Sequence, residues 1–188
     1  MKYENLKSDW ILNLAGLTGV SVMLLTAFYY QFFKDELPCP LCLLQRVGII
    51  IIGFGFLFNL RFGIKGLHYC FSLLGCVLTG IIAGRQVLLH ITPGTPGYGS
   101  ALFGLHFYTW ALVASVGMVI AISVMIAVGG RALCLRNSLI LAFVNKYKQI
   151  LYIVFALLIV GNLLSTLLEC GTGQCADNPV SYELLHWK

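Results

Sequence analysis

The sequence contains very little charge. Asp, Glu, Lys and Arg make up 10% of its 188 residues, whereas hydrophobic residues make up 59%. A typical soluble domain carries about 25% charged residues, so this composition excludes a soluble globular protein and predicts an integral membrane protein. The net charge is +5, but the basic residues lie in short clusters between apolar runs. Because they form no basic stripe or basic domain, we expect no nucleic-acid partner.

Long polar stretches are missing too. A membrane-spanning helix needs about 20 apolar residues, and runs of that length occur at residues 10–33, 41–60, 67–90, 105–129 and 149–168. The first run is too long for a signal peptide and is followed by no small-residue cleavage site, so we expect it to remain as a helix. The connections leave no room for a soluble domain. We predict an all-α fold, a polytopic membrane helical bundle in which residues 1–188 form a single integral membrane domain with a tail at 169–188.

The positively charged residues predict the orientation of this bundle. A cytoplasmic N-terminus leaves only Lys34 and Lys188 in the outer segments. It places the other lysines and arginines of the connections and the N-terminal segment inside, namely Lys2, Lys7, Arg61, Lys65, Arg131, Arg136, Lys146 and Lys148. Five crossings then put the tail outside.

The same orientation sorts the cysteines by compartment. Cys39, Cys42, Cys170 and Cys175 reach the outer, oxidising side, where cysteines are expected to pair. Three cysteines are not expected to form disulfides, because Cys70 and Cys134 lie toward the cytoplasm and Cys76 lies within the membrane.

The first outer pair, Cys39 and Cys42, forms a Cys-x-x-Cys motif where the second helix begins. Pro40 suits the first turn of a helix, which places Cys42 where unpaired N–H groups and the helix dipole favour a thiolate. Arg46 lies one turn later on the same face, so the two side chains predict a site for an electron-rich ligand. A purely structural disulfide and an arginine that extends to the membrane surface are the alternatives. No second motif or histidine cluster completes four zinc ligands, so we predict no metal site.

The second outer pair, Cys170 and Cys175, follows the fifth helix directly. Two intervening glycines allow the backbone to close a small disulfide ring. Exposed disulfides are often the labile, catalytic ones, although a structural staple for the tail is the alternative. Exchange between the two pairs would pass electrons two at a time to a membrane acceptor, for which a quinone is the natural choice. Cys42 would donate to the quinone ring, and Arg46 would stabilise negative charge on its oxygen.

Further polar residues close the third apolar run. Arg85 and Gln86 could line the pocket for the quinone head group, with His90 beside them at the membrane interface. The alternatives are extension to the surface for Arg85 and simple solvation for His90. Aromatic residues at the start of the fourth run are interpreted as an interfacial belt; they are Phe107, Tyr108 and Trp110.

Cys39, Cys42 and Arg46 resemble the motif of the DsbB family of membrane disulfide-forming oxidoreductases, in which an arginine follows the second cysteine by four residues. The segment 85–90 also resembles the end of the third helix in that family, and the likeness covers about residues 10–130. It implies a four-helix core in the bacterial inner membrane, a quinone acceptor (ubiquinone or menaquinone), and a periplasmic thioredoxin-like partner of the DsbA type. In bacteria, electron transfer from DsbA through DsbB to quinone keeps the periplasm oxidising. The resemblance also implies that Cys42 faces the quinone and that Cys39 exchanges with a shuttle pair.

The chain departs from that family in one respect. Family members usually carry the shuttle cysteines between the third and fourth helices, whereas residues 91–104 contain none and Tyr98 stands about where the first would be. The fifth helix, with Cys170 and Cys175 beyond it, supplies a pair that takes the shuttle role by chemistry and topology.

Two other functions remain open at this point. The chain could be a non-catalytic binding or assembly protein whose disulfides hold the tail to the bundle. It could also be a reductase that runs in the opposite direction and resembles vitamin K epoxide reductases, because relative reduction potentials decide the direction of electron flow.

Overall fold

The computed structural model describes residues 8–92, 94, 97–128 and 138–185, and confirms the helical membrane bundle. Within these residues, five helices are long and apolar enough to cross a membrane. They are α1 (Ser8–Phe33), α2 (Pro40–Phe62), α3 (Gly66–Leu89), α4 (Phe107–Val128) and α5 (Ser138–Cys170). Several residues discussed above lie outside the described part of the chain: Lys2, Lys7, Arg131, Cys134, Arg136 and Lys188.

The helix ends agree with the apolar runs except at the start of α5. This helix begins at Ser138, before the predicted start at residue 149. The predicted apolar run starts after the polar stretch 145–148, because apolarity locates only the part of a helix that can lie in hydrocarbon. The helical backbone continues through this stretch to Ser138, since its lysines are good helix formers.

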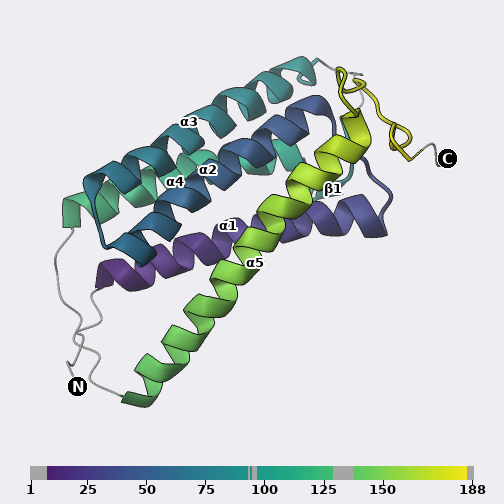
Figure 1. The fold of residues 1–188 in the computed structure, drawn as a ribbon. Coiled ribbons are helices and arrows are strands. Elements are labelled where there is room, and N and C mark those ends of the chain that lie inside the picture. The colour runs from purple at the N-terminus through teal and green to yellow at the C-terminus, as the bar shows by residue number, and fades with distance from the viewer. Residues whose placement is uncertain (1–7, 93, 95–96, 129–137, 186–188) are drawn as a thin grey trace.

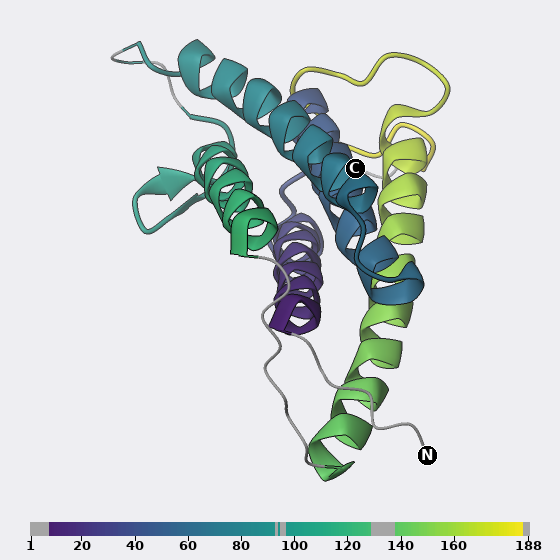
Figure 2. The ribbon, with the colours of Figure 1, turned by 90° about the vertical axis from the view of Figure 1, so that its left-hand side faces the viewer.

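α2 lies at the centre of the bundle. It packs most extensively against α3 and also contacts α1 and α5, while α4 packs on the side of α3 (Figures 1 and 2). The buried core between these helices includes Leu17 and Val20 of α1, Phe56 of α2 and Phe155 of α5. α5 crosses α1 obliquely (Figure 1) and joins the core through Leu151, Phe155 and Leu158.

Glycines bring α2 and α3 close together. A Cβ added to Gly75 of α3 would lie 2.6 Å from the backbone N of Ile52 and 2.7 Å from the backbone O of Gly48, both on α2. Small residues permit this approach of backbones, which is a common way for membrane helices to associate. The contact fixes the position of α3 relative to the start of α2.

Buried polar side chains connect the first three helices at the end opposite the cysteines. Asn13 Nδ2 donates to Tyr69 Oη at 2.8 Å, and Asn59 Nδ2 donates to Asn13 Oδ1 at 2.8 Å. The ring Nδ1 of His68 lies 3.1 Å from Asn59 Oδ1. Each of these groups is satisfied inside the bundle, as a low-dielectric environment requires.

The segment between α3 and α4 contains a small hairpin, β1 (Ala101–Leu102) and β2 (Leu105–His106), which are antiparallel. The two turn residues, Phe103 and Gly104, both have positive φ, at 52° and 79°. Positive φ at both positions is the type I′ geometry that suits the twist of a two-residue hairpin.

The chain after α5 folds back onto the end of that helix. Gly171 has a φ of 60° and its N–H bonds to the O of Leu167 at 2.9 Å, so it ends the helix with a left-handed residue. Leu184 N then donates to Leu168 O at 3.1 Å. Figures 1 and 2 show this tail at the same end of the bundle as the start of α2, far from the start of α1.

Candidate functional site

The Cys-x-x-Cys motif caps the N-terminus of α2. Cys39 is the N-cap residue, Pro40 begins the helix, and Cys39 Sγ accepts a hydrogen bond from Cys42 N at 3.1 Å. The two cysteines form a disulfide with a Cα–Cα distance of 4.9 Å, and we call them the helix-mouth pair. Cys39 is buried, with 5% of its surface exposed, whereas Cys42 is half-buried. The first-turn position of Cys42 agrees with the placement expected from Pro40.

Cys42 lines a cavity of about 280 Å³. Its walls come from α1, the segment before α2, the start of α2, the hairpin loop and the start of α4. Gln45 and Arg46 also line it, together with the aromatic side chains Tyr30, Tyr98, Phe107, Tyr108 and Trp110. Three of these aromatics, Phe107, Tyr108 and Trp110, were predicted to form an interfacial belt, and in the structure they line the cavity.

Arg46 is held inside the bundle. Arg46 is only 7% exposed. Its guanidinium donates to Gln31 Oε1 at 2.7 Å and to Ala27 O at 3.3 Å. The guanidinium carbon also lies 5.4 Å from the centre of the Phe28 ring. These contacts hold the positive charge at the cavity and not at the membrane surface.

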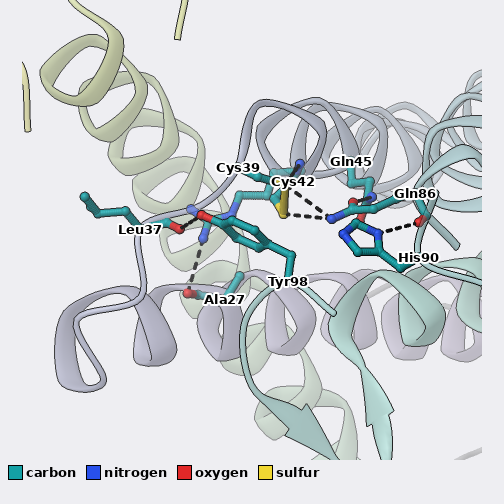
Figure 3. The surroundings of a disulfide bond; sticks show 9 residues. Ala27, Leu37, Cys39, Cys42, Gln45, Gln86, His90 and Tyr98 are labelled. Carbon is teal, nitrogen blue, oxygen red and sulfur yellow. Dashed lines mark hydrogen bonds between the residues drawn. A yellow bond between two sulfur atoms is a disulfide. The ribbon is translucent and has the colours of Figure 1, made fainter. Parts of the chain in front are cut away.

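Gln86 approaches both sulfurs of the helix-mouth pair from α3, as Figure 3 shows. Its Nε2 lies 3.3 Å from Cys39 Sγ and 3.7 Å from Cys42 Sγ, and its Oε1 accepts from Gln45 Nε2 at 2.7 Å. Gln86 is 1% exposed. The amide therefore lies behind the disulfide and does not line the cavity.

The other two polar residues at the end of α3 have different positions. Arg85 is exposed and does not line the cavity, because one residue along a helix turns the side chain about 100° away from Gln86. His90 Nδ1 donates to Gln86 O at 2.9 Å, and its ring stacks on Tyr108 with centres 5.4 Å apart. His90 is thus separated from the cavity by the Tyr108 ring.

The hairpin loop is fastened across the segment that precedes α2. Tyr98 Oη donates to Leu37 O at 2.7 Å, and the backbone N and the hydroxyl of Ser100 both donate to the Glu36 carboxylate. Burial raises the pKa of Tyr98, and the negative charges of Glu169 and Glu36 raise it further. The phenol therefore stays protonated and keeps its hydrogen bond above the pH at which an exposed tyrosine ionises.

Cys170 and Cys175 form the second disulfide, with a Cα–Cα distance of 4.5 Å; we call them the tail pair. Cys170 is 4% exposed, whereas Cys175 is half-buried and follows the exposed residues 172–174. Glu169 is 5% exposed, and neither of its carboxylate oxygens has a hydrogen-bond partner among the described residues. The two remaining described cysteines are free: Cys70 is exposed and Cys76 is buried.

Hydrogen bonds through Gln31 connect the surroundings of the two cysteine pairs. Gln31 bonds both to Arg46, one turn after Cys42, and to Ser165, five residues before Cys170. Sequence reasoning missed Gln31 and Gln45. A polar residue in an apolar run was the available signal, but Asn13 and Asn59, which serve packing at the other end, give the same signal. Among the described residues, no group of three or more His, Cys, Asp or Glu side chains is placed to hold a metal.

Comparison with known proteins confirms the resemblance noted in the sequence. Residues 9–100 match the family "Disulfide bond formation protein DsbB". Relatives named "Disulfide bond formation protein B" include those of Nitrosococcus oceani, 38% identical over 103 residues, and Hahella chejuensis, 35% identical over 97 residues. These alignments cover 50% and 48% of this chain and 58% and 55% of the relatives, so the chain spans a little over half the length of each. No solved structure matches. The matched segment includes the helix-mouth pair and Arg46, and ends before α4 and α5.

Proposed function

We propose, starting from the likeness of residues 9–100 to the DsbB family, that this chain is a membrane thiol:quinone oxidoreductase that drives disulfide formation. In this proposal it re-oxidises a soluble thioredoxin-like protein of the DsbA type and passes the electrons to a membrane quinone. One observation carries the proposal: Cys42, part of a disulfide, and Arg46, a buried cation, line the same aromatic-walled cavity.

The residues of the cavity suit a quinone head group. Tyr30, Phe107 and Trp110 provide flat apolar surfaces, and the cavity volume of about 280 Å³ is near the lower end of the range for small-molecule sites. Arg46 would supply a fixed positive charge to stabilise negative charge that develops on a quinone oxygen. When bound, a quinone accepts two electrons and two protons. The helix N-terminus and the amide of Gln86 both stabilise a thiolate of the helix-mouth pair.

Exposure gives the order within the tail pair, and the likeness to the DsbB family gives the order within the helix-mouth pair. A partner thiolate attacks Sγ of Cys175, the more exposed sulfur of the tail pair, and the electron pair of the broken bond leaves on Cys170. The second partner thiol completes the partner's disulfide and releases Cys175. Cys170 then attacks Cys39, and the bond to Cys42 breaks with its electron pair on Cys42. Cys175 attacks Cys170 in turn, which re-forms the tail disulfide and releases Cys39 as a thiolate. Two electrons and two protons thus move from the partner's dithiol to the helix-mouth pair at each cycle.

We further propose that residues 1–188 form one integral membrane domain in the bacterial inner membrane, with the N-terminus cytoplasmic and the tail periplasmic. The chain has five apolar helices of membrane-spanning length in its described part, which fits a multi-pass membrane protein. An odd number of crossings supports the placement of the tail opposite the N-terminus, and the distribution of Lys and Arg supports its direction.

Quinone reduction by the purified protein tests the function directly. We expect protein in detergent to reduce a short-chain quinone when it is supplied with a reduced thioredoxin-like protein, as followed by quinone absorbance. Cys42→Ser should lower the rate at least a hundredfold, because no cysteine would remain at the cavity. Cys70→Ser changes an exposed free cysteine and should keep the wild-type rate.

Other outcomes distinguish the alternatives. Full turnover by Cys42→Ser would end the proposal. A protein that is reduced by quinol and then reduces disulfides of the partner would be a reductase that runs in the opposite direction. A protein that neither reduces quinone nor is reduced by quinol would be a binding or assembly protein.

A further inference from the structure

The hydrogen bonds of Arg46 lead out of the segment that matches the DsbB family and into α5 and the tail. Arg46 Nη1 donates to Gln31 Oε1 at 2.7 Å. Gln31 Nε2 in turn donates to Ser165 Oγ at 2.6 Å and to Tyr182 Oη at 3.1 Å. Gln31 is 2% exposed, so these three side chains are its partners in place of water.

The chemistry of the donors fixes the orientation of the Gln31 amide. A guanidinium can only donate hydrogen bonds, so the amide oxygen must face Arg46. The amide NH₂ group must then face the hydroxyl oxygens of Ser165 and Tyr182, which accept. Gln31 therefore connects Arg46 to α5 and to the tail through opposite ends of one rigid planar group.

Arg46 needs this support because its other contacts are weaker. Its hydrogen bond to Ala27 O is long, at 3.3 Å, and its contact with Phe28 is a cation–π contact at 5.4 Å. A long arginine side chain loses about 2 kcal/mol of rotamer entropy when it is held in one conformation. The 2.7 Å bond to Gln31 is thus the main contact that orients the guanidinium.

α5 also supplies an opposing charge. Glu169, in the last turn of α5, acts electrostatically on Arg46, and its carboxylate oxygens have no hydrogen-bond partner among the described residues. A buried cation in a membrane protein is normally accompanied by such a group. Both the hydrogen-bond support and the counter-charge of Arg46 therefore depend on α5.

The position of Tyr182 depends on how the tail folds back after the tail pair. Glu183 N donates to Glu169 O at 3.4 Å and Leu184 N donates to Leu168 O at 3.1 Å, which places Tyr182 against α1. The backbone contacts that fold the tail onto α5 therefore also position Tyr182, which accepts a hydrogen bond from Gln31.

We propose that Gln31 is a positioning residue, and that α5 and the tail hold the guanidinium of Arg46 at the quinone cavity through Ser165 and Tyr182. This inference rests on the proposed function, because it concerns the same cavity. It gives α5 a second role: besides carrying the tail pair, α5 completes a site whose cysteines and arginine come from the segment 9–100.

Quinone affinity tests this role independently of the tail pair. The full-length protein in detergent is supplied with dithiothreitol, a small dithiol that can reduce the helix-mouth pair directly, and the KM for a short-chain quinone is measured. We expect the double variant Ser165→Ala, Tyr182→Phe to raise this KM about tenfold with a smaller change in kcat, on the scale of one lost hydrogen bond. Gln31→Leu should have at least the same effect.

Two variants separate positioning from a general loss of structure. Gln31→Glu keeps an acceptor for Arg46, and the hydroxyls of Ser165 and Tyr182 can rotate to donate to it, so the KM should stay within about twofold of wild type. Tyr29→Phe removes the hydroxyl of an exposed tyrosine on the same helix and should leave the KM unchanged.

The double variant deletes only two oxygen atoms, so it should remain folded even if Gln31→Leu does not. An unchanged KM in the folded double variant would overturn the inference and leave the proposed function intact. A wild-type protein that reduces quinone with neither dithiothreitol nor a thioredoxin-like donor would overturn both.

Discussion

At the scale of single residues, the helix-mouth disulfide is surrounded by groups that favour its reduced form. Gln86 Nε2 lies within hydrogen-bond distance of both sulfurs, and Cys42 N donates to Cys39 Sγ. A donor bonds more strongly to a thiolate than to a disulfide sulfur, because the thiolate carries a full charge. These donors therefore raise the reduction potential of the pair and make it a better oxidant.

Replacement of this donor should lower the reduction potential. We expect Gln86→Leu to lower the potential of the helix-mouth pair by about 30 mV, which corresponds to ~1.4 kcal/mol for a two-electron couple. Equilibration with glutathione redox buffers, followed by thiol alkylation, measures the change. Leu88→Ala, on the exposed side of α3, is the control and should show the wild-type potential. A potential that stays the same or rises in Gln86→Leu would contradict this account of the amide.

At the scale of helices, the site depends on how closely α2 and α3 approach. α2 carries Cys42, Gln45 and Arg46, whereas Gln86 is on α3. The Gln45–Gln86 bond of 2.7 Å and the Gln86 contacts with sulfur form only if the two backbones keep their separation. The glycine contact described above sets that separation, so packing in the middle of the bundle determines geometry at the end that carries the helix-mouth pair.

A methyl group at this contact should push the helices apart. We expect Gly75→Ala to lower the free energy of unfolding by about 1–3 kcal/mol, the range for overpacking, because its Cβ would meet backbone atoms of Ile52 and Gly48 that cannot move independently. Unfolding in detergent measures the loss. Gly19→Ala is the matched control, since a Cβ there meets nothing within 4 Å, and alanine favours a helix by about 1 kcal/mol over glycine. Equal stability of the two variants would show that the close approach is not limiting.

At the scale of the whole molecule, two cysteine pairs from distant parts of the chain lie at one end of the bundle. The helix-mouth pair begins α2 and the tail pair ends α5, and the contacts of Gln31 join the two regions. The loop between α3 and α4 lies at this end and contains no cysteine. The fifth helix brings the second pair to the same end. The relay that we propose therefore needs no cysteines in that loop.

Removal of the tail pair should separate two classes of electron donor. We expect the double variant Cys170→Ser, Cys175→Ser to oxidise a thioredoxin-like protein at least tenfold more slowly than wild type. Its rate of dithiothreitol oxidation should be unchanged, because this small dithiol can reach the helix-mouth pair directly. Both rates are measured at saturating quinone, so that a looser Arg46 does not affect them. An equal loss with both donors would mean that the tail pair is structural, and no loss with either would mean that the partner reacts with Cys39 directly.

The sequence by itself determined the helices and the local chemistry of the helix-mouth pair. Apolar runs, a proline after Cys39 and an arginine at a four-residue spacing are properties of consecutive residues, and the physical forces that they represent act within one helix. Tertiary structure alone decided which polar side chains meet. Gln31 and Ser165 are 134 positions apart, and of the neighbours Arg85 and Gln86 only the second faces the sulfurs. Such choices depend on how helices rotate and cross to fill the core, and that packing is settled by all the side chains together.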